Sequence, residues 1–171
     1  MADLELILLR HGLAEPHGSV EDRLRALTPQ GRQRTLRVCQ RASQLGLQAS
    51  SLISSPLVRA RQTADIAVEA GLAPALSCDE ALAPGMDPWP LIHNWWVRGR
   101  ESAAAGKVIL VGHEPDLSLL ACRLIAAPAG ALTLKKAGIA VLAWSGTAPF
   151  PSTASPAQLR LLLTPKVLAA I

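Results

Sequence analysis

Two histidines and two arginines stand close behind short apolar runs of this chain, and together they could carry out phosphoryl transfer. Arg10 and His11 directly follow the run Leu4–Leu9, and His113 follows another such run after one glycine. Arg59 comes shortly after a third run. An arginine can hold two phosphoryl oxygens at once, and a neutral histidine nitrogen can attack phosphorus. These residue types predict a phosphate pocket that needs no metal, in which one histidine becomes phosphorylated and the other groups stabilise negative charge.

The elements that would position these side chains alternate between strand and helix. In chain order we expect strand 4–9, helix 30–45, strand 52–55, helix 57–70, edge strand 75–78, helix 89–105, strand 107–111, a helix ending near 125, and strands 139–144 and 159–163. Thr28-Pro29 should start helix 30–45, and Ser54-Ser55-Pro56 should cap helix 57–70. This alternation predicts an α/β fold, a three-layer α/β/α sandwich with a mainly parallel sheet and one antiparallel strand. Because ligands bind at the carboxyl ends of such strands, the four side chains should share one site.

Composition limits the other possibilities. A length of 171 residues predicts a single domain, 1–171, and half of the residues are hydrophobic. The net charge of +4 comes from basic residues spread along the chain, so no nucleic-acid partner is expected. Cys39, Cys78 and Cys122 have neither metal-ligand spacing nor disulfide density, and we expect no metal or cofactor. Without a basic leader or a long apolar run, we expect a cytoplasmic protein with no membrane contact.

Some notable residues are expected to lie outside the site. Trp89, Trp95 and Trp96 have helical spacing and should pack their helix on the sheet rather than line a pocket. His17 is expected in a loop and His93 in the Trp-rich helix. The cations of helix 30–45 should mostly face solvent; they are Arg32, Arg34, Arg37 and Arg41.

Taken together, these motifs resemble the histidine phosphatase superfamily, which has a phosphoglycerate mutase-like fold. The matching stretches are Arg10-His11-Gly12, the pattern Ser-x-Leu-x-Arg-Ala-x-x-Thr at 55–63, and Gly112-His113. The resemblance implies that His11 is the nucleophile. It also implies that Arg10, Arg59 and His113 complete the phosphate pocket, and that the chain is a phosphatase.

Within that superfamily, two further stretches resemble the small phosphohistidine phosphatases of bacterial signal transduction. They are Arg25-Ala26-Leu27-Thr28-Pro29-x-Gly31 and Gly112-His113-Glu114-Pro115-Asp116. This likeness implies a metal-independent hydrolase whose partner is a protein carrying phosphohistidine. It also makes Arg25 a candidate substrate contact, with a solvated loop cation as the equal alternative.

The sequence leaves three alternatives for the proton donor: Glu80, Glu114 or neither of them. A protonated phosphohistidine already carries a good leaving group, so a pocket without a certain acid favours P–N over P–O substrates. One alternative is a phosphomonoesterase that acts on a small phosphorylated metabolite. Another is a non-catalytic module that binds a phosphorylated ligand, which a missing nucleophile or arginine would indicate; all four core positions are present.

Overall fold

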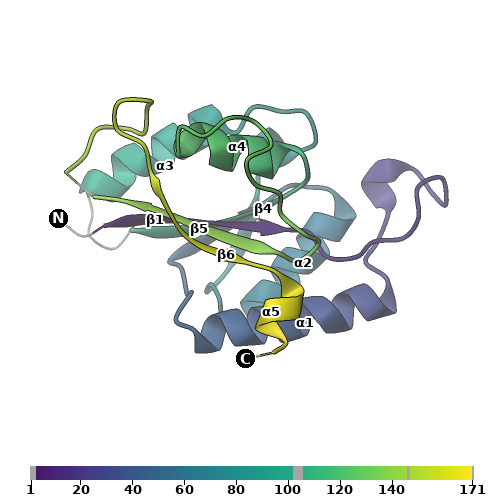
Figure 1. Ribbon diagram of the computed structural model, residues 1–171. Coiled ribbons are helices and arrows are strands. Elements are labelled where there is room, and N and C mark those ends of the chain that lie inside the picture. Colours follow the sequence, from purple (N-terminus) through teal and green to yellow (C-terminus); the bar gives the residue numbers. More distant parts are fainter. Residues whose placement is uncertain (1–2, 102–105, 146, 171) are drawn as a thin grey trace.

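The fold is built on one mixed sheet, seen in a computed structural model that describes residues 3–101, 106–145 and 147–170 (Figure 1). Its strands are β1 (Leu4–Arg10), β2 (Ser51–Ser54), β3 (Leu76–Cys78), β4 (Lys107–Gly112), β5 (Ile139–Trp144) and β6 (Gln158–Leu163). The helices are α1 (Pro29–Gln44), α2 (Val58–Glu69), α3 (Trp89–Glu101), α4 (Asp116–Leu124) and α5 (Pro165–Leu168), with 3-10 turns η1 (Asp22–Leu24) and η2 (Glu80–Leu82).

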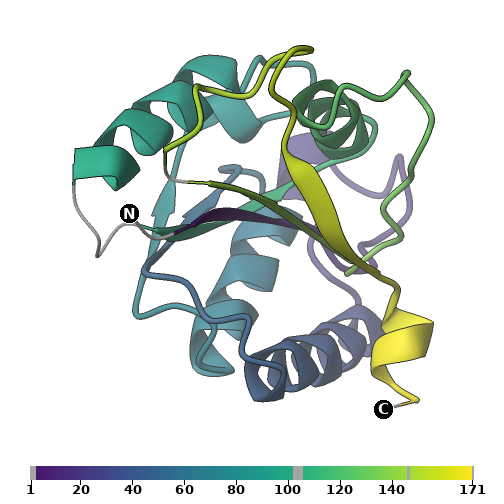
Figure 2. The same cartoon turned by 60° about the vertical axis from the view of Figure 1, so that its left-hand side comes forward.

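The strand order is β3-β2-β4-β1-β5-β6. The pairs β2–β3, β2–β4 and β1–β4 are parallel, whereas β5 runs antiparallel to both β1 and β6. Helices α3 and α4 cover one face of the sheet, and α1, α2 and α5 cover the other (Figures 1 and 2). The predicted three-layer sandwich with one antiparallel strand is therefore confirmed.

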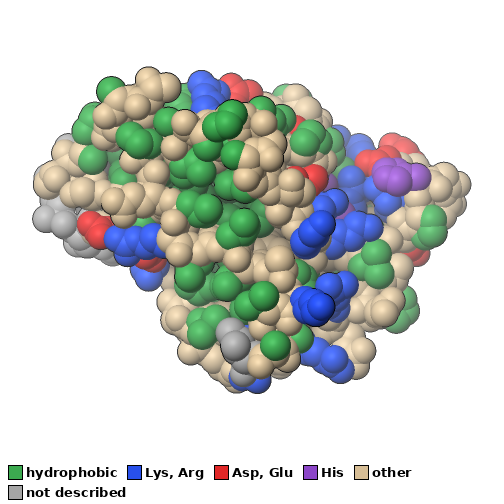
Figure 3. Space-filling view, in the orientation of Figure 1, with side chains coloured by type: hydrophobic (Ala, Val, Ile, Leu, Met, Phe, Trp, Pro, Cys, Tyr) green, Lys and Arg blue, Asp and Glu red, His purple; other side chains and the backbone are tan. Residues whose placement is uncertain are grey.

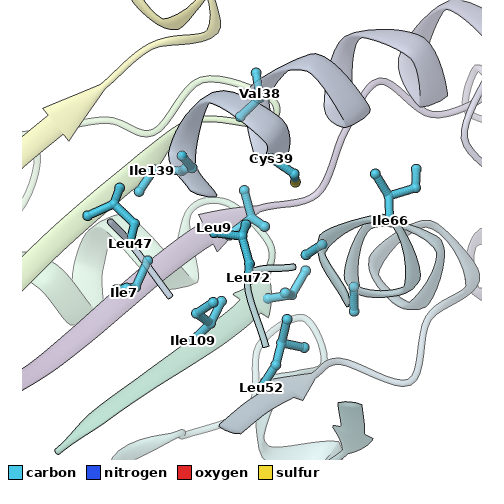
Figure 4. Packing of buried hydrophobic residues seen from close by; sticks show 14 of the residues in the cluster. Ile7, Leu9, Val38, Cys39, Leu47, Leu52, Ile66, Leu72, Ile109 and Ile139 are labelled. Atoms are coloured by element: carbon cyan, nitrogen blue, oxygen red, sulfur yellow. The ribbon is translucent and has the colours of Figure 1, made fainter. Parts of the chain in front are cut away.

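Each face of the sheet has its own apolar core. Alternate side chains of β1 point to opposite faces, so Leu6 and Leu8 join one cluster while Ile7 and Leu9 join the other. Figure 4 shows the cluster that holds Ile7 and Leu9, which lies under α1. Trp95 is buried in the cluster that holds Leu6 and Leu8, and the other tryptophans of α3 pack against that cluster. The prediction that the Trp-rich helix packs on the sheet is therefore confirmed.

Local signals set the helix ends. Thr28 Oγ1 accepts a hydrogen bond from Gly31 N at 2.9 Å and Pro29 opens α1, as predicted. The expected serine cap of α2 is only partly present, because Leu57 is the N-cap and its N donates to Ser55 Oγ at 3.3 Å. Positions 102–105 of the expected helix 89–105 lie outside the described residues. None of the helices in the described part of the chain combines the length and the hydropathy that a membrane-spanning segment needs.

Candidate active site

The two predicted histidines meet because their strands are neighbours. Arg10 of β1 pairs with Gly112 of β4 in parallel register, so the next residue of each strand, His11 and His113, emerges at the same edge of the sheet. Their ring centroids lie 5.1 Å apart, with the ring planes inclined at 53°. Both imidazoles are buried. The sequence-based prediction that they share one site agrees with this geometry.

Gly12 allows the chain to turn closely over α1 and α2 just after the nucleophile candidate. A Cβ at this position would overlap Thr35 Oγ1 of α1, so only glycine fits without a shift. Gly12 N donates to Thr63 Oγ1 at 3.0 Å, and the same hydroxyl donates to Arg59 O at 2.8 Å. Thr63 therefore joins the segment that carries His11 to the helix that carries Arg59.

The hydrogen bond of His11 defines which ring nitrogen is free to react. His11 Nδ1 lies 2.7 Å from Gly12 O, and a carbonyl oxygen can only accept, so Nδ1 carries the proton and Nε2 keeps its lone pair. Burial lowers the pKa of His11 to about 3, against the raising effect of that carbonyl, and the nearby His113, Arg59 and Arg10 lower it further. The imidazole is therefore neutral near neutral pH, as a nucleophile must be.

His113 is held by a serine from the next strand. His113 Nε2 lies 2.8 Å from Ser55 Oγ, which follows β2. Burial, and then the charge of Arg59, lower the pKa of His113 to about 4. Sequence reasoning assigned Ser55 to the cap of α2 and missed this contact; its place in the motif at 55–63 was the available signal.

The five predicted site residues come together around one cavity of about 320 Å³. They are Arg10, His11, Arg25, Arg59 and His113. Arg25 is 6% exposed, so its interpretation as a solvated loop cation is wrong. The lining holds four cations, Arg10, Arg25, Arg59 and Lys136, against three carboxylates, Glu15, Asp22 and Glu114. The cations are in excess, so the cavity favours an anion.

Asp22 of η1 bridges two of these arginines and was missed by the sequence analysis. Arg25 Nε donates to Asp22 Oδ1 at 2.8 Å, and Arg59 NH2 donates to Asp22 Oδ2 at 3.0 Å. Arg59 NH1 also donates to Asp22 O at 2.7 Å. Burial opposes ionisation, but these hydrogen bonds from Arg25 and Arg59 hold the pKa of Asp22 below its usual value. Asp22 thus fixes both guanidinium groups at the cavity.

The structure separates the two candidate acids. Glu114 lines the cavity, and its Oε2 accepts a hydrogen bond from Ser118 Oγ at 2.6 Å. Glu80 is not among the described residues that line it, and instead pairs with Arg23 at 2.8 Å on the surface. Of the two candidates, Glu114 is therefore the one placed to exchange a proton with a ligand in the cavity.

The two remaining histidines lie in different parts of the molecule. His17 lies in a loop, as expected, and lines the cavity from its exposed rim. His93 packs against Trp96 and Phe150 on the other side of the sheet, as expected for a residue of the Trp-rich helix. Within the part of the chain that the structure describes, no group of three or more His, Cys, Asp or Glu side chains could hold a metal ion.

Comparisons with known proteins point to one family. A family model described as "Histidine phosphatase superfamily (branch 1)" matches residues 6–83, which include His11 and Arg59. A protein of Picosynechococcus sp., itself uncharacterised, is 41% identical over 138 residues, which is 80% of this chain and 82% of the relative.

Solved structures show the same fold at low sequence identity. The protein histidine phosphatase SixA, complexed with tungstate, matches with a TM-score of 0.81 and 17% identity over 96% of this chain and 99% of that chain. A mycobacterial glucosyl-3-phosphoglycerate phosphatase matches with a TM-score of 0.70 and 19% identity over 94% of this chain and 99% of that chain. These likenesses define the fold as phosphoglycerate mutase-like.

Proposed function

This chain belongs to the histidine phosphatase superfamily and is a phosphatase, and we propose that it works without a metal, through a phosphohistidine formed on His11. We further propose that residues 1–171 act as one histidine phosphatase domain and that the substrate is phosphohistidine on a partner protein in signal transduction. The hydrogen bond from His11 Nδ1 to Gly12 O carries the first proposal, because it leaves Nε2 unprotonated beside the arginines of the cavity.

The proposed reaction has two steps. His11 Nε2 attacks phosphorus in line with the substrate's P–N bond, which breaks, and the protonated substrate ring leaves as neutral imidazole. Water then attacks the phosphorus on His11 and the P–Nε2 bond breaks, so its electron pair returns to Nε2. Inorganic phosphate is released, and the proton lost by the water passes to Glu114 or to solvent. Nδ1 keeps its proton throughout.

Arginine N–H groups support the role of the cavity as a phosphate site. Arg10 NH1 donates to Leu134 O at 2.8 Å and Arg59 is held by Asp22, so both guanidinium groups are oriented before a ligand arrives. Among the described residues, Arg10 Nε and Arg59 Nε are buried N–H groups with no hydrogen-bond partner. Buried donors without partners are costly, and a tetrahedral oxyanion can accept from them.

The assay for this proposal is phosphate release by the purified protein in the presence of EDTA. A phosphohistidine peptide and an aryl phosphate serve as the two substrates. Wild type should cleave the phosphohistidine peptide faster than the aryl phosphate. His11→Asn should abolish both the release of phosphate and the formation of the acid-labile phosphohistidine on the enzyme. His93→Gln, which changes a histidine outside the cavity, is the matched control and should keep full activity. An active His11→Asn variant would overturn the assignment of the nucleophile.

A second candidate, a phosphomonoesterase on a small phosphorylated metabolite, is favoured by Glu114. An alkoxide leaving group needs a proton, and a carboxyl group at the cavity could supply one. The sequence argument for P–N substrates assumed a pocket without a certain acid, and Glu114 at the cavity removes that assumption. If the aryl phosphate is the better substrate and Glu114→Gln abolishes that preference, the monoesterase activity replaces phosphohistidine hydrolysis.

A further inference from the structure

A groove rich in cations runs from the active-site cavity toward α1 and α5. We call it the basic groove and define it by Arg10, Arg34, Arg37, Lys135, Lys136 and Lys166. Its part nearest the cavity has a volume of about 570 Å³ and shares Arg10 and Lys136 with the cavity lining. Figure 3 shows Lys and Arg side chains gathered in a band to the right of centre on this face.

The fold holds these cations in place although they come from separate segments. Arg10 NH1 donates to Leu134 O at 2.8 Å, and Ala137 N donates to Arg10 O at 3.1 Å, so the turn that carries Lys135 and Lys136 is tied to the end of β1. On the other side, Leu168 of α5 lies in the same buried cluster as residues of α1. That packing places Lys166 beside Arg34, with which it lines the groove.

The charge of the basic groove is largely uncompensated. No Asp or Glu is among the described residues that line it. Within the described part of the chain, no ion pair joins Arg34, Lys135 or Lys166 to a carboxylate, although ion pairs form elsewhere on the surface. These side chains are exposed and free to approach an anionic partner. The groove therefore attracts negative charge without losing internal pairs.

The length of the groove favours a protein over a small anion. Gln30, Gln33, Arg34 and Arg37 line it at helical spacing along one face of α1, which spans about 10 Å at 1.5 Å per residue. The groove extends beyond the active-site cavity, so a single phosphoryl group cannot fill both the cavity and the groove. Nucleic acid fits less well, because none of the described aromatic side chains lines the groove and bases would find no stacking surface.

We propose that the basic groove docks an acidic surface of the substrate protein, next to the phosphohistidine that enters the cavity. The proposal rests on the proposed function for the identity of the phosphorylated group, but the docking itself can be tested without turnover. The groove would then act as a specificity determinant, because it raises the association rate and affinity of acidic partners while leaving the chemistry at His11 unchanged.

The test compares two unphosphorylated, fluorescently labelled peptides by anisotropy. One contains a run of Asp and Glu, and the other has Asn and Gln at the same positions. Wild type should bind the acidic peptide at least about tenfold more tightly than the Asn/Gln peptide. This difference in affinity should shrink as added salt screens the charges. The triple variant Arg34→Gln, Lys135→Gln, Lys166→Gln should lose most of this difference. None of the three residues lines the active-site cavity.

A matched control separates the groove from net charge. The variant Arg32→Gln, Arg41→Gln, Arg98→Gln removes the same number of exposed cations outside the groove and should keep the preference for the acidic peptide. Equal binding of the two peptides by wild type would overturn the docking proposal, as would an equal loss in both triple variants. Tighter binding of an oligonucleotide of the same charge would assign the groove to nucleic acid instead.

Phosphohistidine versions of the two peptides then connect docking with turnover. If the docking proposal is right and the protein hydrolyses phosphohistidine, kcat/KM is higher for the acidic peptide, and only the groove variant removes the difference. If the acidic peptide binds in the groove but neither phosphopeptide is cleaved, the docking proposal stands and the proposed function fails. If both phosphopeptides are cleaved with equal kcat/KM, the proposed function stands and the docking proposal fails.

Discussion

The two buried histidines should make the stability of this protein depend steeply on pH. Burial lowers the pKa of His11 to about 3 and that of His113 to about 4, from 6.5 for an unperturbed histidine. Below pH 6.5 the unfolded chain binds protons that the folded chain does not. The free energy of unfolding must therefore fall as the pH falls from neutrality toward these lowered pKa values.

The size of the effect follows from linkage. Each pKa unit corresponds to about 1.4 kcal/mol, so between about pH 7.5 and pH 5.0 each histidine reduces the free energy of unfolding by about 2 kcal/mol. Together His11 and His113 account for about 4 kcal/mol over that interval. A typical domain has only about 5–15 kcal/mol of net stability, so this loss is large.

Urea denaturation at these two pH values measures the effect. The variant His11→Asn, His113→Gln keeps an amide near His11 Nδ1 and near His113 Nε2 but cannot titrate. Its loss of stability on acidification should be smaller than that of wild type by about 4 kcal/mol. The control His17→Gln, His93→Gln changes only exposed histidines and should behave like wild type. If wild type and the buried double variant lose the same stability, the histidines are not held neutral by burial and the reasoning is wrong.

Other perturbations test separate parts of the site. Arg59→Ala should lower kcat/KM about 100- to 1,000-fold with the fold retained by circular dichroism, because it removes oriented donors from the cavity. Gly12→Ala should destabilise the protein by about 1–3 kcal/mol in thermal unfolding, and adding Thr35→Ala should recover part of that loss because it removes the overlapping hydroxyl. Glu114→Gln should slow aryl phosphate hydrolysis at least about 100-fold and phosphohistidine hydrolysis much less, which steady-state assays of both substrates can decide.

Much of the fold and the core of the site could be predicted because the signals are local. Apolar runs gave the central strands, and Thr28 with Pro29 gave the start of α1. Arg10, His11 and His113 each follow such a run, and parallel strands deliver their carboxyl ends to one edge.

Partners that meet across the fold could not be predicted in this way. Ser55 reaches His113 across neighbouring strands, and Asp22 reaches Arg59 from a loop that no periodic pattern describes. The choice between Glu80 and Glu114 also needed the structure, because both stand at loop positions compatible with the motifs. Hydrogen bonds require atoms within about 3 Å, and sequence separation says little about such distances.

The sequence by itself indicated which chemistry is available, since two arginines and two histidines that each follow a strand suit the binding and transfer of a phosphoryl group. It also determined the order of strands and helices, because apolar periodicity depends only on nearby residues. Only the tertiary structure decided that Arg34, Lys135 and Lys166 form one basic groove, although the sequence spreads them over more than a hundred positions. Electrostatic energy depends on distance through space, and packing of α5 and the turn before β5 against their neighbours sets that distance.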